Sequence, residues 1–311
     1  MAKIYEMNRV VDKIVYQCMG YRKGERILII TDDQLIQIAN FFYERIKILG
    51  IETLCMRIIP RRVHGEEPPP EVASALKTTH IALLITSKSL SHTLARQIAS
   101  RKHGVRIASM PGITLDILRR SLDIDYEKLY TETKRLAKIL NKGRNVRVTT
   151  ERGTDVSFSI KGRKIFEDNG IYTQRGAFGN LPAGEICLSP LEGTTQGKLI
   201  VDASFAGWGK LEEPLKFEIK DGFVKKINNL KLKKFLSAMG KSAYNIAEFG
   251  IGLNPKAKIT GNVLEDEKAK NTAHFALGDN LSFGGRIRAR CHLDGVFRKP
   301  QIWVDGVKLV I

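Results

Sequence analysis

Hydrophobic residues in the first half of the chain come in short continuous runs, and segments with helical spacing lie between these runs. Continuous β-branched runs are typical of strands buried on both faces, and intervening helices cover a parallel sheet. The alternation predicts a doubly wound α/β domain with a mostly parallel sheet. The expected strands span 26–31, 53–59, 81–85 and 105–108, and the expected helices span 35–46, 72–76, 94–98 and 126–140.

The pattern changes after Gly143, where short strands and glycine-rich turns replace the strand–helix alternation. Asp221-Gly222 and Asp305-Gly306 are each flanked by strand-like sequence, which is a strong signal for a β-hairpin. One helix interrupts the strands, with apolar residues at helical spacing from Leu232 to Met239. We therefore expect two domains, an α/β domain over residues 1–143 and a β-rich α+β domain over residues 144–311.

Charged residues interrupt the apolar ones in the first twenty positions, which predicts an amphipathic helix over residues 1–20 instead of a signal peptide. No apolar run is long enough for a membrane span, so we expect a cytoplasmic protein without a membrane partner. The formal net charge is +18, but the lysines and arginines are spread evenly and no base-stacking motif accompanies them. Nucleic acid is therefore not an expected partner.

Cysteine spacing and the turn after the first strand exclude two common kinds of site. Cys18, Cys55, Cys187 and Cys291 form no Cys-x-x-Cys pair, so neither a zinc ribbon nor a disulfide framework is indicated. Asp32 and Asp33 follow the first strand without the glycine-rich turn that binds a pyrophosphate, so no nucleotide cofactor is expected. Asp33 is expected to cap the following helix.

The candidate chemistry lies in the second domain, where residues 285–295 alternate with a period of two. This predicts one strand that presents Arg288, Arg290, His292 and Asp294 on the same face. Residues two apart on a strand lie about 7 Å apart along the backbone, within reach of a shared ion.

A second candidate strand places His274 on a face with Thr272 and Ala276, while Phe275 and Leu277 enter the core. Carboxylates stand nearby in the sequence and could join these histidines in a metal site. They are Glu185, Glu248, Glu265, Asp266 and Glu267.

Four segments of the second domain carry a resemblance to the aminopeptidase T and S family of metallopeptidases, and the first domain is similar through 91–93 and 104–112. The matching segments are 179–185 (GNLPAGE), 247–255 (AEFGIGLNP), 265–278 (with EDE and TAHFALG) and 292–295 (HLDG). The resemblance implies an α/β domain joined to a β-rich domain that holds two divalent ions such as Zn²⁺, Co²⁺ or Mn²⁺. It also implies a homodimer that removes N-terminal residues from peptides.

Carried over position by position, the resemblance gives each residue a role. It implies that Glu267 is the catalytic general base, and that the metal ligands are Glu185, Glu248, His274, His292 and Asp294. Two features depart from the family. The spacing from Glu267 to His274 is longer, so Glu265 could be the catalytic residue instead of Glu267. Leu281 replaces a tyrosine that could stabilise an oxyanion.

The same residues support a different chemistry, because His274, His292 and Asp294 are the two histidines and one carboxylate that hold a single Fe²⁺ in oxygenases. The dihydroxypyridine ring-cleaving dioxygenases resemble the aminopeptidase group, so the fold does not decide. Three additional glutamates favour a second ion, which would offset their mutual repulsion. The sequence therefore predicts a metalloaminopeptidase, a hydrolase acting on a peptide substrate, with a ring-cleaving Fe(II) dioxygenase as the alternative. A chain whose metal is structural or lost is the third reading.

Overall fold

The structure, a computed structural model, describes residues 2–311, with side chains from Tyr5 onward; Met1 of the expected first helix lies outside the described residues. The chain forms two compact units. Unit 1 runs to Glu127 and includes Gly170–Ala183, and unit 2 comprises Lys128–Asn169 and Gly184–Ile311. The single boundary expected after Gly143 differs from this division. Most of the helix before Gly143 belongs to unit 2, and 170–183 returns to unit 1 to supply a strand to its sheet.

Unit 1 is built on a five-stranded sheet with the order β2-β1-β3-β4-β8, and every neighbouring pair is parallel. The order confirms the doubly wound α/β prediction, because β3 follows β2 in the chain but lies beyond β1 in the sheet. Its strands are β1 (Ile27–Asp32), β2 (Thr53–Ile58), β3 (Ile81–Ile85), β4 (Arg106–Ser109) and β8 (Phe178–Asn180).

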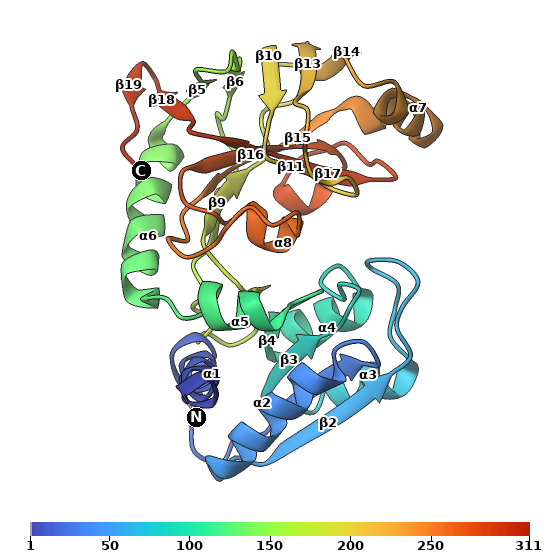
Figure 1. Cartoon of the computed structure of the whole chain (residues 1–311), viewed down its shortest axis with the longest axis vertical. Coiled ribbons are helices and arrows are strands. Elements are labelled where there is room, and N and C mark those ends of the chain that lie inside the picture. Colours follow the sequence, from blue (N-terminus) through green and yellow to red (C-terminus); the bar gives the residue numbers. More distant parts are fainter. Residues whose placement is uncertain (1) are drawn as a thin grey trace. The chain divides into compact units, whose positions relative to one another are not determined.

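Helices precede and connect these strands, as Figure 1 shows in blue to green. They are α1 (Ala2–Lys13) with a π-helical turn (Ile14–Cys18), α2 (Ile36–Ile48), α3 (Pro70–Leu76), α4 (Leu94–His103) and α5 (Leu115–Ser121). Thr93 and Thr114 cap α4 and α5, since each side chain accepts a hydrogen bond from the amide three residues later. Gly104 ends α4 in the left-handed conformation.

The expectation that Asp33 caps α2 is wrong. Asp32, the last residue of β1, binds the backbone that leads into α2. The Oδ1 atom of Asp32 accepts hydrogen bonds from the amides of Gln34 and Leu35. Its Oδ2 atom accepts two more from the amide and hydroxyl of Ser87. Asp33 instead forms an ion pair with Arg57. Asp32 therefore fastens the carboxyl ends of β1 and β3 together.

Unit 2 begins within α6 (Tyr126–Lys142) and contains two antiparallel seven-stranded sheets. The first has the order β14-β13-β10-β6-β5-β18-β19. Its strands are β5 (Asn145–Thr149), β6 (Asp155–Ser159), β10 (Gln196–Val201), β13 (Leu215–Lys220), β14 (Phe223–Ile227), β18 (Gln301–Val304) and β19 (Val307–Lys308). Asp221-Gly222 and Asp305-Gly306 form the predicted two-residue hairpin turns with positive φ.

The second sheet, which we call the site sheet, has the order β12-β11-β17-β16-β15-β9-β7. Its strands are β7 (Phe166–Asp168), β9 (Glu185–Leu188), β11 (Ser204–Phe205), β12 (Gly209–Lys210), β15 (Ile246–Gly252), β16 (Thr272–Gly278) and β17 (His292–Arg298). Helices α7 (Leu230–Met239) and α8 (Val263–Asp266) and 3₁₀ turns at Lys241–Tyr244 and Leu281–Phe283 complete the unit (Figure 1).

Aromatic residues fill the space between the two sheets of unit 2. Phe249 and Phe275 of the site sheet have ring centroids 5.0 Å apart, and Phe158 of β6 lies 5.1 and 5.6 Å from them. Phe297 of β17 stacks on Phe275 at 6.0 Å. One face of the site sheet is therefore committed to the core, and polar side chains in these strands must use the other face.

Strand β17 is shorter than the expected strand over 285–295, because it begins at His292. Side chains bind the backbone amides before it, so those amides are not available to a strand ladder. Asn280 Oδ1 accepts from Ile287, and Asp279 Oδ2 accepts from Ala289. Arg288 and Arg290 consequently lie outside the strand and are exposed.

Among the described residues, no helix has the length and apolar character needed to cross a bilayer.

Candidate metal centre

Strand register places the predicted ligands on one face of the site sheet. His274 of β16 lies opposite Gly250 of β15 and Val296 of β17, and Ala276 lies opposite Glu248 and Asp294. Because paired residues share a face, Glu248, His274 and Asp294 point to the same side of the sheet. His292 is two residues before Asp294, and Glu185 lies opposite Gly252, so both join that side.

A β-bulge in β15 turns Glu248 toward this face. Ile246 lies opposite Leu277, but Glu248 lies opposite Ala276, so Ala247 is an extra residue in the ladder. Without the bulge, Glu248 would share the aromatic core face with Ile246, because residues two apart in a regular strand point the same way.

The predicted carboxylates and histidines form two groups, and within each group the potential ligand atoms lie within 4.8 Å of one another. Glu248, His292 and Asp294 make the first, which we call the His292 group. The second contains Glu185, Glu267 and His274. The structure thus brings together the predicted catalytic residue and all five predicted metal ligands, from β9, β15, β16 and β17 and the end of α8. Their roles stay predictions.

His292 is held in a defined orientation. Its Nδ1 atom donates a hydrogen bond to the carbonyl oxygen of Asp279 at 2.8 Å, which leaves Nε2 to face the carboxylates. Nε2 lies 3.0 Å from Glu248 Oε2 and 3.4 Å from Asp294 Oδ1. The Phe283 ring stacks on the imidazole at 5.0 Å with an interplanar angle of 19°. Metal-binding histidines are commonly oriented by such a carbonyl contact.

His274 is fully buried, and neither ring nitrogen has a hydrogen-bond partner within the described part of the chain. Nε2 lies 3.6 Å from both Glu185 Oε2 and Glu248 Oε1, too far for a hydrogen bond. Gly250 gives the ring room, since a Cβ there would stand 2.2 Å from Cε1 and Nε2. A buried imidazole without partners, beside a glycine that makes room for it, fits a metal ligand.

The electrostatics around Glu248 favour a cation. Burial alone would raise the pKa of the Glu248 carboxyl, but the imidazoles of His274 and His292 hold that pKa far below its usual range. Burial would lower the pKa of His274, whereas Glu248 and Glu185 raise it to about 9. Against the same burial, Asp294 and Glu248 raise the pKa of His292. The carboxylates therefore favour positive charge next to them, which the protonated imidazoles provide. A divalent ion bound by the neutral imidazoles would provide the same positive charge.

Lys268 is a site residue that sequence reasoning missed. Its side chain is fully buried, and its Nζ atom contacts Glu185, lies 2.8 Å from Glu267 Oε1 and lies 3.4 Å from Asp168 Oδ2. Burial opposes its charge, yet Glu185, Glu267 and Asp168 together raise its pKa. One lysine among 51 lysines and arginines gives no signal in the sequence.

Glu267 lies within the site, whereas Glu265 does not. Burial, with Glu185 and Asp294 nearby, raises the pKa of Glu267 to about 8 despite the Lys268 ammonium. Glu265 instead accepts a hydrogen bond from the Lys258 amide at 2.9 Å. Of the two candidate catalytic carboxylates, only Glu267 therefore belongs to a group of potential ligand atoms, together with Glu185 and His274. Leu281, in place of the family tyrosine, lies in an exposed 3₁₀ turn.

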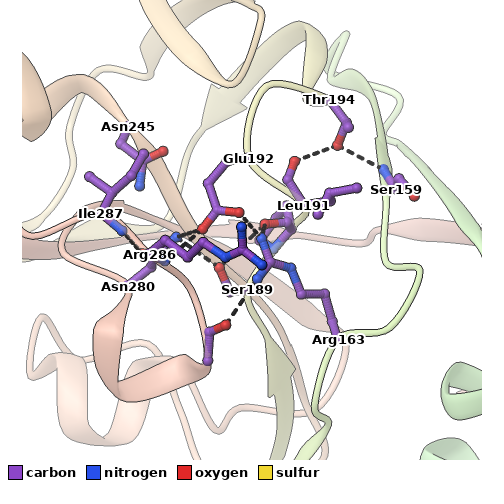
Figure 2. A network of polar contacts seen from close by, with 12 residues as sticks. Ser159, Arg163, Ser189, Leu191, Glu192, Thr194, Asn245, Asn280, Arg286 and Ile287 are labelled. Carbon is purple, nitrogen blue, oxygen red and sulfur yellow. Dashed lines mark hydrogen bonds and ion pairs between the residues drawn. The ribbon is translucent and has the colours of Figure 1, made fainter.

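A polar network holds the segment before His292, and Figure 2 shows it. The fully buried Asn280 donates to Ser189 Oγ and Glu192 Oε1 at 3.0 Å each and accepts from the Ile287 amide at 2.8 Å. Glu192 forms an ion pair with Arg163 and accepts from the Arg286 amide. This network fixes Asp279 and Asn280, and therefore the carbonyl that orients His292.

The fold and this face of the site sheet define a class: an α/β unit joined to an antiparallel β-rich unit that carries histidines and carboxylates able to hold a metal ion. A family model described as NicX, 2,5-dihydroxypyridine 5,6-dioxygenase, matches residues 17–311. The chain belongs to that family.

A curated relative supports the assignment. The 2,5-dihydroxypyridine 5,6-dioxygenase of Pseudomonas putida KT2440 is 24% identical over 218 residues, which are 63% of this chain. The matched segment spans 60% of that relative's own length.

Two solved structures share the fold. The structure of 2,5-dihydroxypyridine dioxygenase from P. putida KT2440 matches with a TM-score of 0.82 and 18% identity, over 99% of this chain and 95% of that one. Wild-type AmpT from Thermus thermophilus, an aminopeptidase T, matches with a TM-score of 0.70 and 13% identity, over 98% and 97% of the two chains. The resemblance to aminopeptidase T therefore holds for the fold.

The predicted function is wrong. The family model and the P. putida relative identify a ring-cleaving dioxygenase family, so the expectations of an aminopeptidase, a peptide hydrolase or protease, and a peptide substrate are overturned. The prediction depended on three glutamates that would require a second ion. It counted their negative charges but not the Lys268 ammonium, which contacts two of them. The homodimer and the cytoplasmic location stay predictions.

Proposed function

We propose that the protein is an Fe(II)-dependent dioxygenase that opens the ring of 2,5-dihydroxypyridine between carbons 5 and 6. The observation that carries the proposal is the arrangement of His274, His292 and Asp294 on one face of the site sheet, in a chain of this family. Two imidazoles and one carboxylate are the set that holds mononuclear Fe(II) in oxygenases and leaves positions open.

His274, His292 and Asp294 would hold the ion, which supplies the one-electron chemistry that lets dioxygen react with an aromatic ring. The chain's own residues orient and shield the centre. The Asp279 carbonyl keeps Nδ1 of His292 protonated and directs Nε2 to the site. Phe283 covers one face of His292, and Phe166 packs against Phe283 at 5.8 Å, which limits water on that side.

Oxygen consumption measured against ring loss tests the proposal. Metal-free protein is loaded anaerobically with Fe²⁺ and mixed with 2,5-dihydroxypyridine in aerated buffer, while an oxygen electrode and ring absorbance are followed together. A dioxygenase places both atoms of one dioxygen molecule in each opened ring, so equal molar losses of dioxygen and ring are expected. His103→Ala, a change on an exposed histidine of α4, is the matched control and retains activity.

The proposal fails if Fe²⁺-loaded protein leaves 2,5-dihydroxypyridine intact under conditions in which the P. putida dioxygenase consumes it. Aminoacyl-anilides are assayed in parallel with Zn²⁺, Co²⁺ and Mn²⁺, and no hydrolysis is expected.

A further inference from the structure

Lys268 places a positive charge inside the acidic centre. It follows Glu267 directly, just beyond α8, and its side chain has no exposed surface. Its Nζ atom contacts Glu185, Glu267 and Asp168, all three of which lie in unit 2. An ammonium group has three donors and no acceptor. Glu185 and Glu267 each accept one hydrogen bond from it, and Asp168 Oδ2 lies 3.4 Å away as an ion-pair partner. Burying a lysine without such partners is very costly, so the charge is built into the site.

The carboxylates that contact Lys268 are those that a second ion would need. Glu185 and Glu267 form, with His274, the second group of potential ligand atoms, and each gives one oxygen to the ammonium. A divalent ion placed there would lose those oxygens and be repelled by a fixed positive charge a few ångströms away. The His292 group has no lysine or arginine among the ion pairs described for its three members.

We propose that the Lys268 ammonium takes the place of a second divalent ion and thereby limits the centre to one ion, held on the side of His292 and Asp294. The inference rests on the proposed function, since that function supplies the first ion. It assigns Glu185 and Glu267 to the lysine, whereas the sequence resemblance assigned Glu185 to a metal. Lys268 is in this sense a specificity residue for metal stoichiometry.

Lys268→Met tests the proposal, because methionine keeps the length of the side chain and removes the charge. Metal-stripped protein is titrated anaerobically with Co²⁺ and Mn²⁺, and ions per chain are counted by elemental analysis after gel filtration. Wild type is expected to hold one ion. Lys268→Met is expected to hold two, with the second site at least about 100-fold tighter than any second site in wild type. Lys270→Met, an exposed lysine two residues away, is the matched control and holds one.

Each outcome has a defined meaning. Two ions per chain in wild type would overturn the inference, and so would a folded Lys268→Met variant that still binds only one ion. In either case the proposed function would still be tested by the dioxygenase assay. No ion in wild type would overturn both.

Lys268→Gln answers the same question if Lys268→Met does not fold. Its amide still donates to carboxylates but carries no charge, so two ions are again expected, and one ion would again count against the proposal. Lys268→Arg keeps the charge and is expected to hold one ion.

Discussion

Asp32 in unit 1 and His274 in unit 2 are both buried polar side chains in central strands, but their surroundings differ. Both carboxylate oxygens of Asp32 accept hydrogen bonds, from Gln34, Leu35 and Ser87. His274 has no hydrogen-bond partner for either ring nitrogen within the described residues. A buried group that folding alone satisfies has a structural role, whereas one left unsatisfied indicates a ligand. The contrast supports the candidate metal centre in unit 2, where both nitrogens of one imidazole lack a partner and carboxylates lie close by.

The largest effect is expected from the ligands themselves. His292→Ala and Asp294→Ala remove an imidazole or a carboxylate of the centre, and metal affinity should fall by more than about 100-fold, beyond the effect of losing an outer partner. Metal content after gel filtration measures this, and circular dichroism should show unit 1 still folded. Full metal occupancy in either variant would show that the replaced residue is not a metal ligand, and the contrast between the two units would then lose its support.

Gly250→Ala should disturb His274 without deleting it. The added Cβ would stand 2.2 Å from two ring atoms, so the imidazole must move. We expect metal affinity to fall about 10- to 100-fold, as when a partner that positions a ligand is lost, and the free energy of unfolding to fall by about 1–3 kcal/mol from overpacking.

Gly252→Ala is the matched control for this change. It lies on the same face of β15, but its Cβ would meet the Ala269 carbonyl and the Thr272 side chain instead of an imidazole. It should lower stability with a smaller effect on the metal. Equal metal affinity in wild type and Gly250→Ala would show that His274 is not a ligand.

Asp32→Asn tests the other side of the comparison. The amide group cannot accept all the hydrogen bonds that the carboxylate accepts, so a buried donor loses its partner, at a cost of about 1–3 kcal/mol. The melting temperature should fall while metal content stays at the wild-type level. A loss of metal would mean that the contrast between a structural and a ligand-binding buried group does not hold.

The smallest effect concerns the ion pair of Glu25 and Arg106 in unit 1. Burial would raise the pKa of Glu25, but the Arg106 guanidinium and the Arg22 amide outweigh it and lower that pKa below 4.5. A lowered folded-state pKa contributes stability above the unfolded value, and this contribution is lost as pH falls through the folded value. Urea unfolding of wild type should therefore lose more stability between about pH 5 and pH 3 than Glu25→Gln, by about 1 kcal/mol. Equal losses of stability in wild type and Glu25→Gln over this pH range would show that the Glu25–Arg106 ion pair does not stabilise the fold.

Alternation and helical spacing were sufficient to predict most of the fold. The continuous runs became the parallel strands of unit 1, and both Asp-Gly pairs became hairpin turns. The return of Gly170–Ala183 to unit 1 could not be predicted from the sequence, because β8 is only three residues long and depends on pairing with β4. Strand β17 was predicted too long, because side chains of Asp279 and Asn280 compete with the sheet for amides.

The candidate site was predicted residue by residue, but its charge balance was not. Alternation placed His274 and Asp294 on polar faces, and family resemblance added Glu185, Glu248 and Glu267. Lys268 escaped notice because its burial results from tertiary contacts with β7 and β9, which are distant in the sequence. The choice between hydrolase and oxygenase depended on that balance, and so the sequence favoured the wrong one.

The bulge in β15 also determines where this strand tolerates a change in length. Ile246 faces the aromatic core and Glu248 faces the imidazoles, and Ala247 is the surplus residue between them. Deleting Ala247 would make the two residues neighbours in an ordinary pleat, and both would keep their present directions. Deleting Phe249 would instead reverse Glu248 relative to Gly250 and direct a carboxylate into the core. A relative that lacks residue 247 would therefore keep the direction of Glu248, and a sequence alignment would show only a gap at that position.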